Sequence, residues 1–367
     1  MQVFVLGMHR SGTSAITRLL IMSGAYFGPE GISNGADEGN PKGFWERVDV
    51  RAVCDGLLQE SGYDWWKVAD FDLDRIPDKV RARHVGNFRK ILLDLDAHRP
   101  WVLKEPRLSL LFPAIRPLLE LPVCIHVTRE PLEVASSLQT RNGIPVHAGL
   151  ALWELYTIRA FAASAGLPRV HVRYEDLMAA PVAVVERLVG QLTDLGVAGL
   201  RVPSEREITA YIDPALHRER RASTDRGLWL NDQQQAIAAA IDDGSALDDA
   251  TLPRELSAGA QAQLRTFEED RARQEEALLE LQARVKELEE RAALDADRIT
   301  RAQALLERAD RQLSLAAGSR SWRLSRRISS LAHPRLRRGG TGSATGEPLE
   351  RTRTLVEQAR ERLTADS

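Results

Sequence analysis

Residues 2–14 of the chain read QVFVLGMHRSGTS, and this stretch decides the fold. The run from Val3 to Leu6 is short and apolar, which is typical of a parallel strand buried on both faces. A turn that contains Gly, Ser and Thr follows, and from Ala15 to Met22 the apolar residues recur at helical spacing. The stretch therefore predicts a strand, a loop and a helix in immediate succession.

Later segments repeat this alternation. Residues 101–103 and 123–127 are apolar runs, and each is followed by a charged turn and a helical pattern. Residues 170–172 form a weaker candidate for a fourth strand. Strands that alternate with helices predict an α/β fold: a three-layer domain with a parallel sheet and a P-loop-like phosphate site after its first strand.

Length, composition and charge limit the number of domains and the classes of protein to consider. The chain has 367 residues, a length that suits about two domains. Its 43% hydrophobic content excludes wholesale disorder, and its formal net charge of -2 gives no field that would attract nucleic acid. Of the 20 aromatic residues, 18 precede position 231, and only Phe267 and Trp322 come later. We therefore predict a globular domain over residues 1–230 and a linker over residues 231–259.

The remaining sequence has the pattern of a rod and a tail. Residues 260–317 contain neither Gly nor Pro, and one heptad register places mostly apolar residues at positions a and d. Arg271, Gln274 and Asp295 interrupt that seam. The pattern predicts a coiled coil that makes the protein a homo-oligomer, with a single solvated helix as the alternative. Residues 318–367 are predicted to be a basic tail, partly disordered, that either contacts an anionic membrane surface or stays solvated.

The cellular compartment is inferred from what the sequence lacks. Cys54 and Cys124 are the only cysteines, too few for a disulfide framework and without the spacing of metal ligands. Met1 leads directly into the first predicted strand, and no run of about 18 apolar residues is present to span a bilayer. We expect a cytoplasmic protein whose membrane contact, if any, is peripheral.

Residues 7–14 carry the clearest chemical motif. They have the outline of a phosphate-binding loop, with two glycines five positions apart and two further residues at the helix start. Successive backbone N–H groups at a helix N-terminus bind anions, and the helix dipole assists them. Thr13 stands where a nucleotide triphosphatase has its lysine, and the cation sits earlier, at Arg10. The loop is therefore predicted to bind an anion other than ATP.

Two motifs carry a family resemblance. The segment 10–14 resembles the 5′-phosphosulfate loop of the sulfotransferases, which use 3′-phosphoadenosine 5′-phosphosulfate (PAPS). The segment 128–137, TREPLEVASS, is similar to that family's 3′-phosphate segment, in which a strand ends in Arg and a Ser follows eight residues later. Ser136 is the alternative hydroxyl. The resemblance implies PAPS as cofactor, no metal, and donor-binding residues Arg10, Ser11, Gly12, Thr13, Ser14, Arg129 and Ser137.

The resemblance also implies the first catalytic residue. Lys104 ends the segment Trp101-Val102-Leu103-Lys104, which looks like the family segment whose Lys contacts the phosphosulfate bridge. There it would neutralise charge that builds on the leaving oxygen. The cytosolic branch of the family has a catalytic His two residues further on, but this chain has Pro106 at that position. A His base at that point is excluded.

The base must then come from elsewhere. Members that act on glycans or tyrosine commonly use a Glu upstream, and Glu46 in the segment 40–46, NPKGFWE, is the first candidate. The rings of Phe44 and Trp45 favour partial desolvation of its carboxylate, which suits a base. A surface carboxylate with no catalytic role is the alternative. Glu105 is the second candidate. His9 is left unassigned, because a histidine in such a loop is more often a spacer than a catalytic residue.

The resemblance covers roughly residues 1–230. It implies transfer of a sulfuryl group to an acceptor hydroxyl or amine, with a carbohydrate or cell-surface glycan as the expected acceptor. Residues 173–177 look like the family's late strand and helix, residues 212–221 could form a basic lid, and the family's late Arg-Lys-Gly loop is not evident. Two other hypotheses remain: a P-loop small-molecule kinase, and a coiled-coil scaffold with a vestigial nucleotide-binding domain.

Overall fold

The protein is described from a computed structural model in which residues 1–33, 35, 43–212, 226–320, 323–324, 327 and 347–365 are placed. The chain divides into two compact units, Met1–Ala272 and Arg273–Ser367, and each is described separately. The first unit holds the sheet, and the second consists of helix in the part that is described.

A parallel sheet forms the centre of the first unit. Its strands are β1 (Gln2–Leu6), β2 (Trp101–Lys104), β3 (Pro122–Thr128) and β4 (Arg169–Arg173), in the spatial order β2-β1-β3-β4. All three pairings are parallel. The carboxyl ends of β1, β2 and β3 therefore lie at one edge, where parallel sheets bind ligands. The predicted fold class, a three-layer α/β domain followed by a helical extension, is confirmed.

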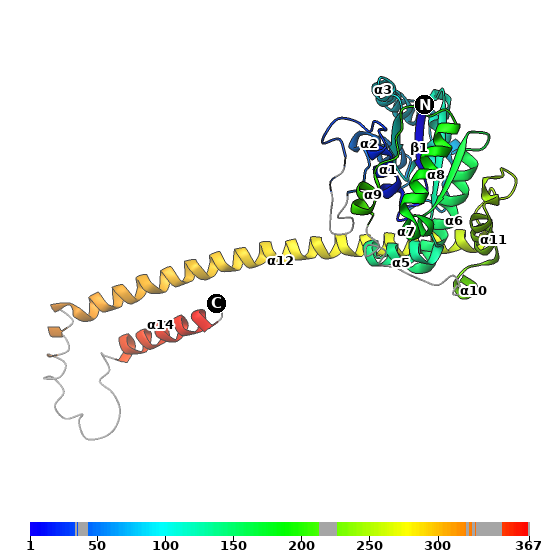
Figure 1. The fold of residues 1–367 in the computed structure, drawn as a ribbon. Helices are drawn as coiled ribbons and strands as arrows, with labels where there is room; N and C mark the ends of the chain where they lie inside the picture. Colours follow the sequence, from blue (N-terminus) through cyan, green and yellow to red (C-terminus); the bar gives the residue numbers. More distant parts are fainter. Residues whose placement is uncertain are drawn as a thin grey trace. The chain divides into compact units, whose positions relative to one another are not determined.

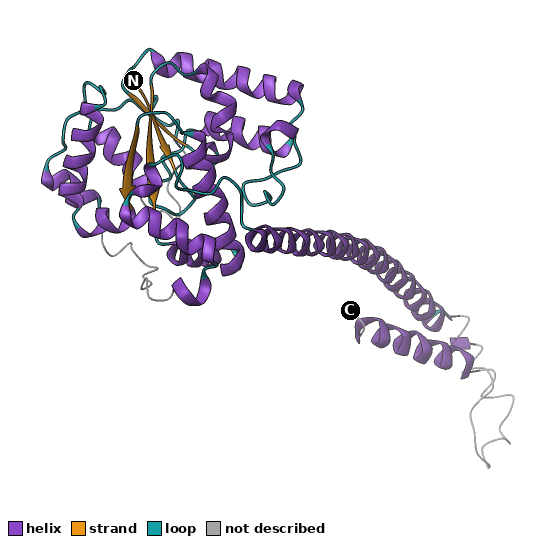
Figure 2. Ribbon diagram, turned by 90° about the vertical axis from the view of Figure 1, so that its right-hand side faces the viewer, coloured by secondary structure: helices purple, strands orange, loops and turns teal. Residues whose placement is uncertain are grey.

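Helices cover both faces of this sheet (Figure 2). Alternate residues of β1 explain the three layers: Phe4 and Leu6 belong to one hydrophobic core, whereas Val3 and Val5 belong to the other. The helices of the first unit that precede the extension are α1 (Thr13–Met22), α2 (Val48–Gln59), α3 (Asp78–Asp96), α4 (Leu108–Ile115), α5 (Pro131–Asn142), α6 (Val146–Ala163), α7 (Tyr174–Ala179), α8 (Pro181–Asp194), α9 (Glu205–Tyr211), α10 (Arg226–Trp229) and α11 (Asp232–Asp243). Short 3-10 turns lie at Leu73–Arg75, Arg116–Leu118 and Ser245–Leu247.

The segment 231–259, predicted as a linker, is instead part of the domain. Asn231 caps α11 by accepting a hydrogen bond from the Gln234 N–H, and the Gln234 side chain bonds back to the Asn231 backbone. Ile237 and Ile241 lie one helical turn apart and are buried in the larger core. Burial of these side chains holds the segment against the sheet layer, so the compact unit reaches Ala272 rather than residue 230.

The extension begins with α12, a continuous helix from Ala258 to Gly318 (Figure 1). In its first turns Ala260, Leu264 and Phe267 are buried in the domain core. The heptad register that predicts the coiled coil has Leu264 at position a and Phe267 at position d. In the structure these two side chains belong to the domain core instead. Beyond Ala272 the apolar seam is at least half exposed in this single chain, at Leu278, Leu281, Val285 and Leu288.

The tail ends in a second helix, α14 (Glu347–Ala365). Half of the predicted basic tail, including Trp322 and residues 328–346, lies outside the described residues. None of the described helices is both long enough and apolar enough to cross a membrane. Cys54 and Cys124 are unpaired and buried in the first unit.

Candidate active site

The phosphate loop connects β1 to α1. Its backbone takes left-handed conformations at Arg10 (φ 70°) and Gly12 (φ 88°), and the Ser11 N–H donates to the Met8 carbonyl at 3.3 Å. A Cβ atom at Gly7 would come within 2.4 Å of the Val127 carbonyl oxygen, and one at Gly12 within 2.3 Å of the Tyr174 ring. Only glycine fits at these two positions. The loop ends at the N-terminus of α1, where backbone N–H groups can bind an anion.

The phosphate loop meets the predicted 3′-phosphate segment. The Arg10 Nε donates to Ser137 Oγ at 3.0 Å, although the two residues are 127 positions apart. Arg129 donates to the Arg10 carbonyl at 3.1 Å and pairs with Glu133 at 2.9 Å, and its guanidinium lies 4.8 Å from the Tyr174 ring centre. The structure thus places two arginines and a hydroxyl side by side, a set that suits a phosphate group.

Lys104 and Glu46 form the second part of the site. The Lys104 Nζ lies 2.5 Å from Glu46 Oε1, and the two side chains are 1% and 9% exposed. The same ammonium donates to Ser14 Oγ at 3.3 Å, and Ser14 donates to the Phe44 carbonyl at 2.7 Å. The first turn of α1, the end of β2 and the Glu46 loop therefore converge on one ammonium group.

Glu105, the second candidate base, has a different environment. Its side chain is fully buried, and burial raises the pKa of its carboxyl. Arg107 donates to Glu105 Oε1 at 2.7 Å and lies 2.6 Å from Asp55. Glu105 therefore belongs to a buried ion-pair group under the site, whereas Glu46 pairs directly with the ammonium of Lys104.

His9, which the sequence left unassigned, occupies a defined position in the loop. Its ring lies 4.7 Å from the Trp65 ring and 5.7 Å from the Tyr156 ring, measured between centres. Burial, followed by the charges of Arg107, Lys104, Arg10 and Arg51, holds the pKa of His9 well below its usual 6.5. His9 is therefore a neutral imidazole at pH 7 that packs against the Trp65 and Tyr156 rings.

Nothing in the local sequence around Trp65 indicates that it contacts the phosphate loop. The same holds for Tyr174, which the sequence placed in a merely supporting segment. Each contacts the loop across a long sequence separation, Trp65 through His9 and Tyr174 through Gly12. The adjacent tryptophans at residues 65 and 66 indicate that this stretch packs against other segments, but not which segments these are.

Some predicted elements cannot be placed. Asn40, Pro41 and Lys42 lie outside the described residues, as do residues 213–221 of the proposed basic lid. Within the part of the chain that is described, no group of three or more His, Cys, Asp or Glu side chains is arranged to hold a metal ion.

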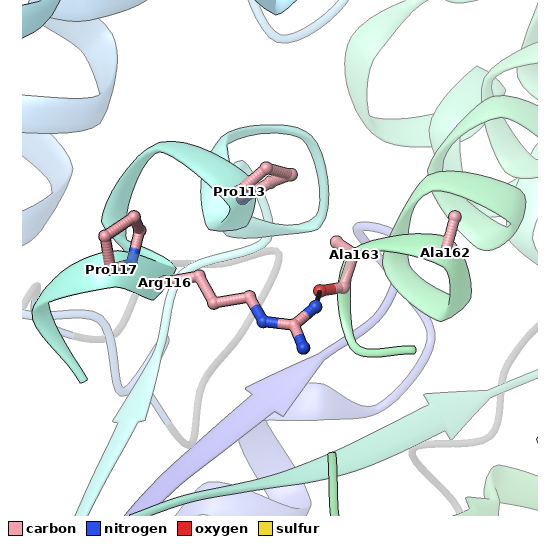
Figure 3. Close-up of a pocket in the computed structure, with 5 residues that line it drawn as sticks. All are labelled: Pro113, Arg116, Pro117, Ala162 and Ala163. Atoms are coloured by element: carbon pink, nitrogen blue, oxygen red, sulfur yellow. Dashed lines mark hydrogen bonds between the residues drawn. The ribbon is translucent and has the colours of Figure 1, made fainter. Parts of the chain in front are cut away.

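A surface hollow of about 490 Å³ lies away from this site. It is lined by Pro113, Arg116, Pro117, Ala162 and Ala163, and Arg116 donates across it to the Ala163 carbonyl at 3.3 Å (Figure 3). These residues close α4 and α6 and precede the first residues of β3 and β4, so the hollow lies at the amino edge of the sheet. The phosphate loop lies at the carboxyl edge, and the hollow takes no part in the candidate site.

Comparison with solved structures finds similar folds among sulfotransferases. One is the sulfotransferase domain of the olefin synthase from Synechococcus PCC 7002, with 20% identity, a TM-score of 0.37, and 73% of this chain and 94% of that one covered. The sulfotransferase domain from the curacin biosynthetic pathway has 16% identity and a TM-score of 0.35, with 72% and 96% covered. Sulfotransferase STF1 from Mycobacterium tuberculosis has 16% identity and a TM-score of 0.34, with 66% and 76% covered.

Comparison with families decides the classification. No curated protein matches the chain. The model of the family described as "Sulfotransferase family" matches residues 2–194, which is more than half of the chain and includes β1 to β4, the phosphate loop, Glu46, Lys104 and Arg129. The chain therefore belongs to the sulfotransferase family.

Proposed function

We propose that this protein transfers a sulfuryl group from PAPS to a hydroxyl or amine of a carbohydrate, such as a cell-surface glycan. The observation that carries the proposal is the buried Lys104–Glu46 pair, 2.5 Å between Nζ and Oε1, beside a phosphate loop whose Arg10 reaches Ser137. A cation, a carboxylate and an anion-binding loop at one sheet edge are the parts that such a transfer needs.

The residues that we propose for donor binding suit an anion with two phosphate groups. Gly7 and Gly12 have no room for a Cβ, so the loop backbone stays open to a ligand at the N-terminus of α1. Arg10, Arg129 and Ser137, which contact one another, would hold the phosphate groups of PAPS. Ser11, Thr13 and Ser14 would supply further contacts from the loop. When bound, PAPS supplies an activated sulfuryl group and a stable leaving phosphate.

Lys104 and Glu46 would divide the chemistry between them. The Lys104 ammonium would stabilise negative charge on the leaving oxygen, and the Glu46 carboxylate would accept the proton of the acceptor group. While they are paired, each compensates the charge of the other in a buried place. A ligand anion that attracts the Lys104 ammonium would free the Glu46 carboxylate for proton transfer.

Ligand binding tests the donor. Calorimetry with adenosine 3′,5′-bisphosphate, in the presence of a chelator, is expected to show tight binding, and ATP with Mg²⁺ is expected to bind much more weakly. Preference for ATP with Mg²⁺ would instead support a kinase. Sulfur-labelled PAPS, incubated with fractionated glycans, lipids and peptides, then tests the acceptor, and label in lipid or peptide alone would overturn the carbohydrate assignment.

The extension suggests how the enzyme is assembled. We propose that it forms homo-oligomers through the seam of α12, because Leu278, Leu281, Val285 and Leu288 are at least half exposed in the single chain. We also propose a cytoplasmic location with peripheral membrane contact through the basic residues after Gly318. Sedimentation and vesicle-binding measurements on the full chain test these two points.

A further inference from the structure

The first turns of α12 contact one loop of the domain through several polar and aromatic interactions. This loop, residues 63–72, joins α2 to the 3-10 turn before α3. The Glu268 carboxylate accepts a hydrogen bond from the Ala69 N–H at 2.7 Å, and Arg265 pairs with Asp70 at 2.6 Å. Gln261 also donates to Asp70 at 3.2 Å. Residues about 190 to 200 positions apart are thus joined by directed polar bonds.

Aromatic packing joins the same two segments. The Trp66 ring lies 5.8 Å from the Phe267 ring, edge to face, and the Arg271 guanidinium lies 4.8 Å from the Trp66 ring centre. Leu264 and Phe267 are buried in the same core as the loop's Val68 and Phe71. The two segments therefore form one packed structure within the first compact unit.

The loop also contacts the phosphate loop. Next to Trp66, the Trp65 ring lies 4.7 Å from the His9 ring, and the Trp65 carbonyl accepts a hydrogen bond from the Tyr156 hydroxyl at 2.8 Å. Tyr156 is fully buried on α6. His9 lies directly before Arg10 in the phosphate loop. A contiguous set of contacts therefore leads from α12 through Trp66 and Trp65 to His9.

A second set of bonds fixes the start of α12 to the same helix α6. Glu154 of α6 is fully buried, and its carboxylate accepts hydrogen bonds from the Ser257 N–H at 2.6 Å and the Ser257 hydroxyl at 3.0 Å. The Gln233 amide donates to it at 2.9 Å. Helix α6 thus carries both the anchor of α12, at Glu154, and the support of Trp65, at Tyr156. Neither α12 nor the 63–72 loop can shift without breaking bonds to the other or to α6.

We propose that the first turns of α12 complete the acceptor side of the active site by holding Trp65 against His9. This inference rests on the proposed sulfuryl transfer. In the strand order β2-β1-β3, Lys104 ends β2 and Arg129 follows β3, so the two lie on opposite sides of the phosphate loop that follows β1. Burial and then the charges of Arg107 and Lys104 lower the pKa of His9, and Arg107 lies three residues after Lys104 in the chain. We therefore assign Trp65 and His9 to the Lys104 side of the loop, and Glu268 is a positioning residue that acts on them through the 63–72 loop.

The experiment uses the full chain with Glu268→Ala, Glu268→Gln and a matched control, Glu287→Ala. Glu287 lies on the same helix beyond the first unit and pairs with Arg284 at 2.6 Å in an exposed position. Glu268→Ala removes the acceptor of the Ala69 N–H, whereas Glu268→Gln keeps a carbonyl oxygen there. The measurements are the apparent KM and kcat for the glycan fraction that takes up most label from sulfur-labelled PAPS, the affinity for adenosine 3′,5′-bisphosphate, and hydrogen exchange at residues 63–72.

The expected result separates positioning from folding. Glu268→Ala should raise the acceptor KM about fivefold, which corresponds to about 1 kcal/mol, with kcat within about twofold and bisphosphate affinity unchanged. Exchange of the Ala69 amide should become about fivefold faster as well. Glu268→Gln should keep both the acceptor KM and the exchange rate of the Ala69 amide close to their wild-type values. Glu287→Ala should change neither quantity.

Two results would overturn the proposal. Faster exchange at Ala69 with an unchanged acceptor KM would mean that α12 holds the loop but the loop does not position the site. Unchanged exchange would mean that α12 does not hold the loop. If the wild-type protein neither binds the bisphosphate nor transfers label, the proposed function fails instead, and the exchange data still report on the contact with α12.

Discussion

The Lys104–Glu46 pair supports a prediction that separates catalysis from stability. Replacement of Glu46 by Gln keeps an oxygen that can accept a hydrogen bond from Lys104 but removes the carboxylate that would take the acceptor proton. Loss of a general base typically lowers a rate by about 10² to 10⁴, which is about 2.7 to 5.5 kcal/mol of transition-state stabilisation. We expect kcat for Glu46→Gln to fall within that range, with bisphosphate affinity within about threefold of the wild-type value.

The effect of the same change on stability should be much smaller. The pair is buried, at 1% and 9% exposure, and the new amide replaces a charged hydrogen bond by a neutral one. Such a change costs about 1 to 2 kcal/mol, small against the roughly 5 to 15 kcal/mol that holds a typical domain folded. Chemical denaturation measures this loss directly, so a folded but inactive variant can be recognised.

Asp49→Asn is the matched control. Asp49 pairs with Arg47 at 2.7 Å in the same stretch of chain, and the Arg47 side chain is only 3% exposed. This variant should lose a comparable free energy of unfolding while its kcat stays within about twofold. The assay is transfer of sulfur label from PAPS to the best acceptor fraction. If Glu46→Gln retained more than about a tenth of the wild-type kcat, Glu46 would not be the base.

The remaining predictions concern the donor site, acid stability and assembly. Gly12→Ala would place a methyl group 2.3 Å from a tyrosine ring at a φ of 88°, so calorimetry should detect no bisphosphate binding; ordinary affinity would show that the loop is not the donor site. Arg129→Ala should weaken bisphosphate binding by about 10- to 100-fold, through loss of charge-assisted hydrogen bonds, and an unchanged Kd would remove Arg129 from the site. Burial lowers the pKa of His171 from 6.5 to about 4, so the unfolded chain takes up its proton first as the pH falls. The free energy of unfolding should therefore be highest above pH 6.5 and decline towards pH 4, and His171→Asn should flatten that decline; an equal decline of the unfolding free energy from pH 6.5 to pH 4 in the wild type and in His171→Asn, measured by chemical denaturation, would contradict this. Leu281→Asn with Leu288→Asn should convert a sedimenting oligomer to a monomer, because polar residues at seam positions weaken a coiled coil; a wild-type protein that is already monomeric would refute self-association.

Much of the fold follows from local pattern, and the reason is visible in β1. Its continuous apolar run is what a strand covered on both faces requires, and the glycines that follow it are required by the close contacts at Val127 and Tyr174. The strand order β2-β1-β3-β4 could not be predicted in this way. It depends on which strands pair across long stretches of chain, and no local periodicity encodes that choice.

Site residues could be predicted where a short sequence motif identifies them. Arg10 and Ser137 could each be selected from motifs, but only the folded chain shows that they meet at 3.0 Å. Glu46 was one of two open choices, and its pairing with Lys104 distinguishes it from Glu105, which pairs with Arg107. Their catalytic roles stay predictions until they are tested.

The boundary of the domain at Ala272 was not predicted from the sequence, and the reason is physical. A scarcity of aromatic residues after position 230 suggested a linker, yet small and branched side chains such as Ile237 and Ile241 fill the core there. Their helical spacing, after an Asn and a Gln in capping positions, was the available indication. Arg271, an apparent flaw in the heptad seam, is explained by its position over the Trp66 ring.

The burial of both cysteines has a practical consequence for measurement. Cys54 and Cys124 are 2% and 0% exposed, and burial raises the pKa of the Cys124 thiol to about 12 and that of Cys54 well above its ordinary value. A thiol in that state carries almost no thiolate at pH 7, so alkylating reagents and spin labels leave it unmodified. A single cysteine introduced on the exposed surface of α12, for example at Glu287, would therefore be labelled selectively in the otherwise native chain. In the proposed homo-oligomer, distance measurements between such labels would report how the α12 helices of the associated chains are aligned.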